Sequence, residues 1–298
     1  MLTVCIPVYN KDVTTLATAL LKQIDASNEN VNIVLIDDKS SSSILQTNSN
    51  ISNDVHFIPL DKNVGRSKIR NKFLEHTDSK YLLFLDCDSK IINDDFIETY
   101  LNYLNQHEPK VLVGASVYGQ NKPSIQYLLR WKYGRIKESK TYSERVSDSS
   151  FSFKTNNFII SRECFAENLF NETISGYGHE DTLFGYDIRK KKIQIEHIDN
   201  PVLNDILDTN REFILKTEEG LHNLLVVLQI TNNDQDLTSK IKLLKYYNRY
   251  RSSGMFKLFF AVAKKPIRYL LTKGCASLFL LDVYKLGYLI RIDSRKNS

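Results

Sequence analysis

Short apolar runs alternate with segments of helical periodicity over the first 120 residues of the chain. The runs are rich in β-branched residues, which is typical of strands that are buried on both faces of a parallel sheet. The predicted strands are Leu2–Val8, Ile33–Asp37, Val55–Leu60, Tyr81–Asp86 and Val111–Val117, and the predicted helices are Val13–Ala26, Arg66–His76 and Asp94–Gln106. This alternation predicts an α/β fold with a doubly wound, mainly parallel, Rossmann-like sheet.

The pattern loosens after residue 117 and becomes wholly helical after about residue 208. Between these points the sequence predicts, in order, a basic helix, a polar loop and two strands, at Gln126–Lys137, Ser139–Ser150, Asn157–Ser161 and Ile193–Ile198. The predicted C-terminal helices are Thr209–Ile230, Leu237–Ser252, Phe256–Leu271 and Ala276–Ile292. We therefore expect one domain over residues 1–208 and a helical C-terminal appendage over residues 209–298.

The composition is that of an ordinary globular protein. With 42% hydrophobic and 25% charged residues, the 298-residue chain can bury a core, which excludes whole-chain disorder. Its four cysteines are far apart in sequence, which favours reduced thiols in a cytoplasmic protein over disulfides or a zinc site. Neither a secretory signal before the first strand nor an apolar stretch of about 18 residues is expected.

The formal net charge of +5 is unevenly distributed along the chain. Residues 240–298 contain 14 Lys and Arg against Asp282 and Asp293, a local excess of +12, whereas residues 1–239 carry 26 basic and 33 acidic residues. The basic C-terminal segments also contain Phe, Leu and Tyr, so they predict either attachment to an anionic membrane surface or packing on the first domain. No nucleic-acid partner is predicted, because the acidic body lacks a recognised nucleic-acid module.

Two carboxylates lie at the end of the apolar strand Tyr81–Asp86. Asp86 and Asp88 are two residues apart, so in an extended chain their side chains project to the same side while Cys87 points away. Ligands of open α/β sheets bind at the carboxyl ends of strands, and paired carboxylates there suit Mg²⁺ or Mn²⁺. The alternative is a solvated strand end without a ligand.

Three other segments near strand ends have groups that suit a nucleotide. The first strand leads into Pro7-Val8-Tyr9-Asn10, the second ends in Asp37-Asp38, and Asn63-Val64-Gly65-Arg66 opens a basic helix that includes Arg70. We expect Tyr9 against the base, Asp38 accepting its imino proton and Arg70 near the phosphates. Taken singly, the acidic pair could instead cap the next segment, and the Gly turn could be an ordinary turn.

The order of these motifs, PxYN, DD-S, NxGxxxxRN and DxD, resembles the inverting glycosyltransferases of family 2, which have the GT-A fold. The resemblance covers about residues 1–205 and departs from the usual pattern at Lys39 and at Lys11-Asp12. It implies a nucleotide-binding half over residues 1–117 and an acceptor half over residues 118–208. The residues that it assigns to the nucleotide are Pro7, Tyr9, Asn10, Asp12, Asp37, Asp38, Asn63, Gly65, Arg66, Arg70, Asp86 and Cys87.

A second acidic pair lies in the block Ser175-Gly176-Tyr177-Gly178-His179-Glu180-Asp181. The block looks like the GxGxED element of chondroitin-polymerase-like and N-acetylgalactosaminyltransferase-like relatives. By that resemblance one carboxylate is the general base that deprotonates the acceptor hydroxyl, for which we favour Asp181, and Glu180 holds the acceptor sugar. The alternative is that both acids only compensate the dipole at a helix start.

Three further residues have two interpretations each. His197 follows a strand, where related transferases often supply a metal ligand, but a lone His is also commonly structural. His179, beside the candidate base, is a weaker candidate for substrate contact. Trp131 lies in a basic segment and could stack on an acceptor sugar or anchor a helix surface.

The motifs together predict a metal-dependent inverting glycosyltransferase of hexosyl or N-acetylhexosaminyl type. The donor is a nucleotide sugar, with UDP favoured; the acceptor is a glycan or lipid-linked hydroxyl at the cytoplasmic face of a membrane. Mn²⁺ or Mg²⁺, held by Asp86, Asp88 and His197, would neutralise the leaving diphosphate. The alternatives are a sugar nucleotidyltransferase, which should show a Gly-rich signature with Lys near the first strand, and a non-catalytic nucleotide- or glycan-binding protein.

Overall fold

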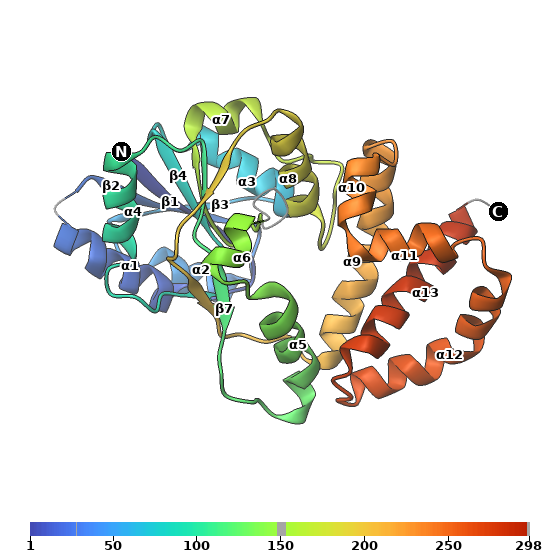
Figure 1. Ribbon diagram of the computed structural model, residues 1–298. Coiled ribbons are helices and arrows are strands. Elements are labelled where there is room, and N and C mark those ends of the chain that lie inside the picture. Colours follow the sequence, from blue (N-terminus) through green and yellow to red (C-terminus); the bar gives the residue numbers. More distant parts are fainter. Residues whose placement is uncertain (28, 148–152, 297–298) are drawn as a thin grey trace. The chain divides into compact units, whose positions relative to one another are not determined.

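The computed structural model describes residues 1–27, 29–147 and 153–296. The chain forms two compact units (Figure 1). The first, here called the sheet unit, comprises Met1–Gly119, Ser139–Thr173 and Glu180–Ile206. The second, the helical unit, comprises Gln120–Glu138, Ile174–His179 and Leu207–Ser298, so it includes two segments that the sequence places before residue 208.

A seven-stranded sheet forms the centre of the sheet unit. Its strands, in the spatial order β3-β2-β1-β4-β8-β6-β9, are β3 (Val55–Pro59), β2 (Val31–Asp37), β1 (Leu2–Val8), β4 (Tyr81–Leu85), β8 (Asn157–Ser161), β6 (Val111–Val113) and β9 (Ile195–His197). Strand β8 runs antiparallel to both of its neighbours, and the other neighbouring pairs are parallel. The predicted α/β class with a mainly parallel sheet is confirmed.

Helices cover both faces of this sheet. Successive strand residues point to opposite faces, so in β1 Val4 belongs to one buried cluster and Cys5 to the other. Helices α1 (Thr14–Ser27) and α4 (Phe96–Gln106) contribute to the first cluster. The second contains residues of α3 (Arg66–Lys72), η1 (Phe73–Glu75), α7 (Arg162–Glu167) and α8 (Glu180–Lys190) (Figure 1). Apolar side chains on both faces account for the continuous apolar strands in the sequence.

The predicted single strand Val111–Val117 is wrong, because the chain changes sheets in its middle. Strand β6 ends at Val113, and β7 (Ser116–Tyr118) joins β5 (Ser89–Lys90) and β10 (Val202–Asn204) in a second sheet of order β5-β10-β7. A side chain at Gly114 would overlap Tyr100, and Ala115 has a φ of 78°. The backbone at Gly114 and Ala115 therefore turns in a way that an unbroken strand cannot.

Polar segments contain helices that the apolar pattern does not reveal. Helix α2 (Ser42–Ser49) follows β2, and α6 (Tyr142–Ser147) lies within the predicted loop Ser139–Ser150. That part of the loop prediction is wrong, and residues 148–150 lie outside the described residues. Helix α6 is held by the buried Arg145, whose guanidinium donates to Val113 O and Ile198 O at 3.1 and 3.0 Å. A single buried cation therefore anchors an otherwise polar helix.

The helical unit contains two hydrophobic clusters of its own. Its elements are η2 (Ile125–Tyr127), α5 (Leu128–Tyr133), η3 (Gly134–Glu138), α9 (Asn210–Ile230), α10 (Gln235–Lys240), α11 (Lys242–Tyr250), α12 (Gly254–Thr272) and α13 (Leu278–Lys296). Helix α9 begins with a capping box in which Thr209 and Glu212 accept hydrogen bonds from each other's backbone N–H. No helix in the described ranges is long and apolar enough to cross a membrane.

The predicted helix Leu237–Ser252 is two helices. Helix α10 ends at Lys240 and α11 begins at Lys242, because Ile241 between them is extended, with φ −83° and ψ 109°. A β-branched side chain favours this conformation, and Ile241 packs against the cluster formed by α9, α11 and α13. The break therefore follows from packing that the helical periodicity does not show.

Candidate active site

The ends of β1 and β2 form one hydrogen-bonded rim at the carboxyl edge of the sheet. Asn10, with a φ of 48°, donates its backbone N–H to Ser40 Oγ at 2.7 Å and accepts from the N–H of Ser41 at 2.9 Å. Asp37 is buried, and its Oδ1 accepts from the N–H of Ser40 at 2.7 Å. Tyr9 projects from this rim and is exposed. The predicted residues Tyr9, Asn10 and Asp37 are thus neighbours.

Asp38 organises the turn that opens α3. Its two carboxylate oxygens accept from the N–H groups of Val64 and Gly65 at 2.6 and 2.9 Å, and its carbonyl accepts from Asn63 Nδ2 at 3.0 Å. Gly65 has a φ of 85°, a conformation that L side chains rarely adopt. The carboxylate is buried and already bonded to the backbone, which argues against the predicted contact between Asp38 and the base.

Three other predicted nucleotide contacts have local structural partners. Pro7 lies within β1, paired with Ile36 of β2. Asp12 Oδ1 accepts from the N–H of Thr14 at the start of α1, and hydrogen bonds with Thr14 lower the pKa of this carboxyl. Burial, followed by the charges of Asp88 and Asp86, raises the pKa of the Cys87 thiol to about 12. The Cys87 thiol is therefore protonated at neutral pH and is no nucleophile there.

Asp86 and Asp88 lie in a turn, and not in an extended segment as the sequence predicts. Strand β4 ends at Leu85, and the N–H of Ser89 donates to Asp86 O at 3.0 Å. Cys87 packs against the first hydrophobic cluster of the sheet unit, and Asp88 is exposed. Because the chain turns directly after β4, strand β5 can begin at Ser89, which an extended segment would not allow.

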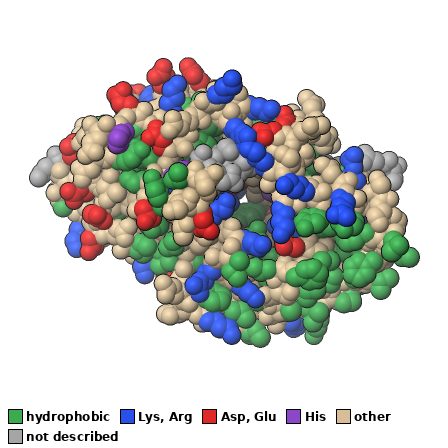
Figure 2. Space-filling view, viewed as in Figure 1, with side chains coloured by type: hydrophobic (Ala, Val, Ile, Leu, Met, Phe, Trp, Pro, Cys, Tyr) green, Lys and Arg blue, Asp and Glu red, His purple; other side chains and the backbone are tan. Residues whose placement is uncertain are grey.

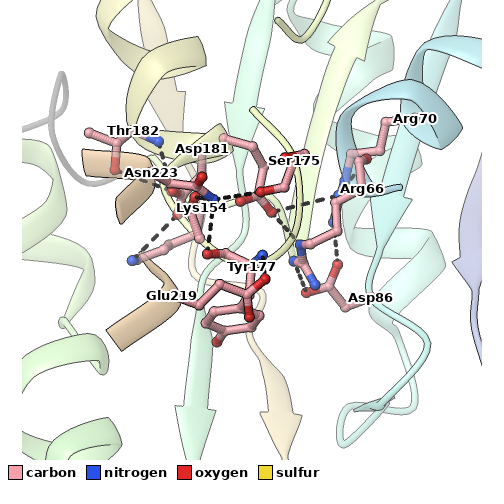
Figure 3. Close-up of polar contacts among 12 residues, drawn as sticks. Arg66, Arg70, Asp86, Lys154, Ser175, Tyr177, Asp181, Thr182, Glu219 and Asn223 are labelled. Carbon is pink, nitrogen blue, oxygen red and sulfur yellow. Dashed lines mark hydrogen bonds and ion pairs between the residues drawn. The ribbon is translucent and has the colours of Figure 1, made fainter. Parts of the chain in front are cut away.

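Two arginines of α3 hold Asp86 and Glu180 together (Figure 3). Arg70 is only 2% exposed, and its Nη2 donates to Asp86 Oδ1 at 2.7 Å. Arg66 donates from Nε to Glu180 Oε1 at 2.5 Å, and its Nη2 lies 4.0 Å from Asp86 Oδ2. Since Arg70 is buried beneath this network, the predicted contact between Arg70 and the phosphates is not supported. Arg66, whose side chain is 39% exposed, is the accessible cation.

Glu180 begins α8 as a buried anion. Burial alone would raise the pKa of Glu180, but the positive charges of Arg66 and Arg70 lower it from 4.5 to about 2. The carboxyl is therefore ionised at any physiological pH, and a base with such a low pKa accepts protons poorly. Its 5% exposure also argues against the predicted role of holding an acceptor sugar. Glu180 instead fixes the two arginines.

Asp181, the next residue, is in a different environment. Its side chain is 23% exposed, its Oδ1 accepts from the N–H of Thr182 at 2.7 Å, and its Oδ2 lies 3.7 Å from Lys154 Nζ. Figure 3 shows Lys154 and Thr182 on either side of this carboxylate. One oxygen is thus oriented by the helix start, and the carboxylate is accessible to a substrate.

The loop before α8 is held by α9 within the helical unit. Asn223 Nδ2 lies within hydrogen-bonding distance of the carbonyl oxygens of Ser175, Tyr177 and Gly178, at 2.8, 3.1 and 3.1 Å (Figure 3). Glu219 accepts from the N–H of Tyr177 at 2.9 Å. Gly178 has a φ of 92°, so this loop needs glycine as well as its partners on α9.

Comparison with known families decides the class of the protein. The model of the family described as Glycosyl transferase family 2 matches residues 3–165, more than half of the chain. The chain belongs to glycosyl transferase family 2. The matched region contains the rim formed by β1 and β2, the Asp86–Asp88 turn and both arginines, but it ends before Glu180 and Asp181.

Two curated family members are related to the first part of the chain. An uncharacterised glycosyltransferase of Haemophilus influenzae is 31% identical over 110 residues, which are 36% of this chain and 43% of that protein. TuaG of Bacillus subtilis, a glycosyltransferase whose name proposes a role in teichuronic acid biosynthesis, is 27% identical over 130 residues, 42% of this chain and 49% of that protein. The chain thus spans less than half the length of these curated relatives.

Solved glycosyltransferase structures share the fold. Residues 1–349 of Staphylococcus aureus TarS align over 100% of this chain and 92% of that one, with a TM-score of 0.51 and 18% identity. The Pyrobaculum calidifontis mannosyltransferase PcManGT, solved with GDP-Man and Mn²⁺, aligns over 99% and 86%, with a TM-score of 0.57 and 14% identity. Identities this low establish the similarity of fold alone, which supports the GT-A assignment.

The family 2 chain does not assemble the predicted three-ligand metal set. Among the described residues, no group of three or more His, Cys, Asp or Glu side chains could hold a metal ion by itself. His197 is buried in β9, with its Nδ1 3.1 Å from Arg145 Nη1. A guanidinium only donates, so Nδ1 accepts and faces a positive charge. This side of the ring is unsuited to a cation, so only Nε2 of His197 could contact a metal, and His197 stays a predicted ligand beside the carboxylates of the Asp86–Asp88 turn.

The remaining candidates have definite surroundings. Trp131 lies in α5 with the guanidinium of Arg135 5.1 Å from its ring centroid, as expected for a helix surface residue. His179 has a φ of 68°, and its ring faces Gly220 of α9. A hollow of about 960 Å³ lies at the opposite, amino ends of the strands, lined in part by Met1, Val55 and Lys80, and it contains none of the predicted site residues.

The sequence patterns did not reveal two residues that shape the site, Lys154 and Asn223. Lys154 beside Asp181 lies in a polar stretch that offers no periodic signal. Asn223, in contrast, could have been noticed, because it is a polar residue between Leu221 and Leu224 on a predicted helix. A buried amide among leucines needs hydrogen-bond partners, and here those partners are the carbonyls of the glycine-containing loop.

Proposed function

We propose that this protein transfers a sugar from a nucleotide-sugar donor to an acceptor hydroxyl, with inversion at the anomeric carbon. The observation on which this rests is the contrast within the sheet unit between arginine-bound acids and accessible acids. Asp86 and Glu180 are bound by Arg66 and Arg70, whereas Asp88 is exposed and Asp181 is partly exposed beside Lys154. The carboxyl edge of the sheet, where these groups lie, is the usual ligand edge of an open α/β fold.

Asp88 is the residue that we assign to a divalent cation. Its carboxylate is exposed, and hard oxygen donors are the ligands that Mn²⁺ and Mg²⁺ prefer. Asp86 lies in the same turn, but Arg70 already occupies one of its oxygens. PcManGT and a glucosyl-3-phosphoglycerate synthase of Mycobacterium tuberculosis were solved with Mn²⁺, which favours the same cofactor here. When bound, the cation would neutralise charge on the leaving diphosphate.

Asp181 is the residue that we assign to proton abstraction from the acceptor hydroxyl. A sugar hydroxyl is a weak nucleophile, and a carboxylate on the face opposite the leaving group activates it for direct displacement. Lys154 and the N–H of Thr182 orient the Asp181 carboxylate. Glu180 cannot share this task, because Arg66 and Arg70 keep it ionised and buried. One base and one displacement give inversion.

The donor is a nucleotide sugar, with UDP favoured over GDP. TarS was solved with UDP and with UDP-GlcNAc, and PcManGT with GDP-Man. The exposed ring of Tyr9 would lie against the base, and Arg66 is the accessible cation for the diphosphate. The acceptor is a glycan or lipid-linked hydroxyl in polysaccharide synthesis, at the cytoplasmic side of a membrane. Family membership disfavours a nucleotidyltransferase, and the accessible carboxylates disfavour a purely binding protein.

The metal assignment is tested by thermal stabilisation of purified protein with UDP or GDP in Mn²⁺. At a concentration one hundred times Kd, a ligand stabilises the native state by about 2.7 kcal/mol, which is readily measured. Asp88→Asn should abolish the Mn²⁺-dependent part of this stabilisation while leaving the melting temperature of the free protein unchanged, because the side chain is exposed. Asp94→Asn, an exposed acid in the segment before α4, is the matched control. Equal nucleotide stabilisation of Asp88→Asn and the parent protein would refute the assignment.

A further inference from the structure

The helical unit contains a long stretch without any acidic residue. From Leu237 to Leu281 the chain has ten Lys and Arg and no Asp or Glu. This stretch includes most of α10, all of α11 and α12, and the start of α13. Surfaces of soluble proteins ordinarily mix both signs of charge, so one-signed charge over this length indicates a partner of opposite charge.

Helix α12 presents an apolar stripe to solvent. Met255, Leu258 and Val262 are 84%, 71% and 76% exposed, and Phe259 is also exposed. Their spacing of three, four and seven residues places them on one face of the helix. The opposite face is the one that packs, because Phe260, Ile267 and Leu271 lie in a buried cluster with α9 and α13. The stripe is therefore additional to the core of the unit.

Two exposed lysines of α12 lie near this stripe. Lys257 lies on the same turn as the stripe and Lys265 just beyond it, and both are exposed. The other two cations of α12 face inward, since Arg268 is ion-paired with Glu218 at 2.9 Å and Lys264 lies 4.8 Å from the Tyr288 ring centroid. Two lysines thus remain at the edge of the exposed apolar face.

Helix α11 adds a basic hollow to the same unit. A cavity of about 530 Å³ is lined by Lys240, Lys242, Lys245, Tyr246 and Arg249. No acidic side chain of the described part of the chain lines it, and Lys242, Lys245 and Arg249 are exposed. Figure 2 shows hydrophobic side chains gathered over α12, with Lys and Arg side chains near α11 on the same face. The helical unit thus offers apolar and basic groups side by side.

We propose that α11 and α12 bind the surface of an anionic lipid bilayer. The apolar stripe of α12 would enter the boundary between headgroups and acyl chains, while the cations of α11 and Lys257 would contact lipid phosphates. Charge complementarity decides between occupants. A second copy of the chain would bring a second acid-free basic surface against the first, and repulsion opposes such a dimer. An anionic bilayer supplies both an apolar interior for the stripe of α12 and negative charge for the cations of α11.

Sedimentation with vesicles of phosphatidylcholine and phosphatidylglycerol tests the proposal on the full chain without any donor. The protein should sediment with these vesicles at low salt and be released as the NaCl concentration rises. It should not bind vesicles of phosphatidylcholine alone. Lys242→Glu with Lys245→Glu should weaken binding at least about tenfold, since each cation near an anionic surface contributes substantially. Lys22→Glu with Lys110→Glu makes the same charge change on exposed lysines of the sheet unit and should bind like the parent.

The apolar part of the proposal needs its own variant. Met255→Gln, Leu258→Gln and Val262→Gln together remove the stripe without touching the buried face of α12, so the protein should stay folded and soluble. Binding should weaken by about tenfold or more, because transfer of exposed apolar side chains into lipid is lost. Ile92→Gln with Ile206→Gln, at two exposed positions of the sheet unit, is the control.

Three outcomes would overturn the proposal. The first is absence of the parent protein from anionic vesicles at low salt. The second is equal loss of binding in the α11 variant and its sheet-unit control, which would indicate net charge alone. The third is a parent protein that is dimeric by sedimentation velocity and becomes monomeric when the stripe is removed, with unchanged vesicle binding; α12 would then be an interface between copies. None of these outcomes depends on sugar transfer, so the proposed function is tested separately.

Discussion

Two acidic pairs of the sheet unit, Asp86 with Asp88 and Glu180 with Asp181, are arranged in the same way around the arginines of α3. In each pair the first acid is bound by arginines of α3, at 2.7 Å for Asp86 and Arg70 and 2.5 Å for Glu180 and Arg66. Of the second acids, Asp88 is exposed, and Asp181 is 23% exposed, the same fraction as Asp86, but lies beside Lys154. One strand end and one helix start therefore give the same arrangement from unrelated local structures.

The comparison shows how sequence proximity conceals a difference in chemistry. Glu180 is buried between two guanidinium groups that lower its pKa to about 2, so it stays ionised at neutral pH and is held in place. Asp181, its neighbour in sequence, is partly exposed beside Lys154, so it is better placed than Glu180 to accept a proton from a substrate. We infer that Arg66 and Arg70 link the two pairs, because each arginine lies within 4.0 Å of both Asp86 and Glu180.

The largest expected effect is that of Asp181→Asn. If this carboxylate is the base, its loss should reduce turnover by a factor of about 10² to 10⁴. Donor affinity should change little, because the base acts on the acceptor. Steady-state transfer and donor titration on the same protein measure the two quantities. A near-normal turnover in Asp181→Asn, with loss in Glu180→Gln at unchanged stability, would reverse the comparison between the two acids.

Asp187→Asn is the matched control for this experiment. Asp187 lies on the same helix, α8, and burial raises the pKa of its carboxyl, so the substitution repeats the same change of atoms in a partly buried setting. It should leave turnover within about twofold of the parent, since it removes no assigned contact. Loss of turnover in both variants would mean that α8 as a whole is disturbed.

The next largest effect is on stability, and it distinguishes Glu180, which is bound by arginines, from Asp181, the proposed base. Glu180→Gln removes the charge that compensates Arg66 and the buried Arg70. Because the folded-state pKa of about 2 lies below the ordinary 4.5, ionised Glu180 stabilises the fold above pH 4.5, and this stabilisation is lost as the pH falls from 4.5 to 2. The shift corresponds to about 3 kcal/mol of unfolding free energy.

Urea unfolding at pH 7 and at acid pH measures this contribution. The parent should be about 3 kcal/mol more stable than Glu180→Gln at pH 7, and the difference should shrink below pH 4.5. Asp181→Asn should show no such difference, since Asp181 is partly exposed. A pH-independent gap between the parent and Glu180→Gln would indicate lost packing and would remove the electrostatic basis of the comparison.

The order of residues in the sequence predicts much of what gathers at this site. It does not predict which of these side chains are buried and which are accessible. The motifs place carboxylates and an arginine around one crevice, because the carboxyl ends of parallel strands share an edge. They do not reveal that Arg70 is buried and Arg66 accessible, which depends on how α3 lies over Phe170 and the sheet. Asp38 illustrates the same limit: its partners, Val64 and Gly65, lie 26 and 27 residues away in the chain.

The fold likewise contains elements that the sequence predicts and elements that it does not predict. Strands β1 to β4 and β8 are predictable because they are apolar on both faces of the sheet. The change of sheet at Gly114 and Ala115 is invisible in an apolar run, since it depends on the close approach of Tyr100. Helix α6 is similarly hidden, because its anchor is the single buried Arg145 and not an apolar face.

The smallest expected effect comes from Asn223, which tests whether the second acidic pair depends on the loop that precedes it. Asn223 Nδ2 lies 2.8 to 3.1 Å from three carbonyl oxygens of residues 175–178, and the chain continues through His179 directly to Glu180 and Asp181. Asn223→Ala should loosen this loop and lower kcat by about tenfold, or about 1.4 kcal/mol, with unchanged donor affinity. Asn248→Ala, an exposed amide on α11, is the control and should leave kcat unchanged. If Asn223 has a purely structural role, Asn223→Ala should lower the melting temperature and leave kcat per folded molecule unchanged. In that case only Lys154 and Thr182, both in the sheet unit, would be left as residues that position Asp181.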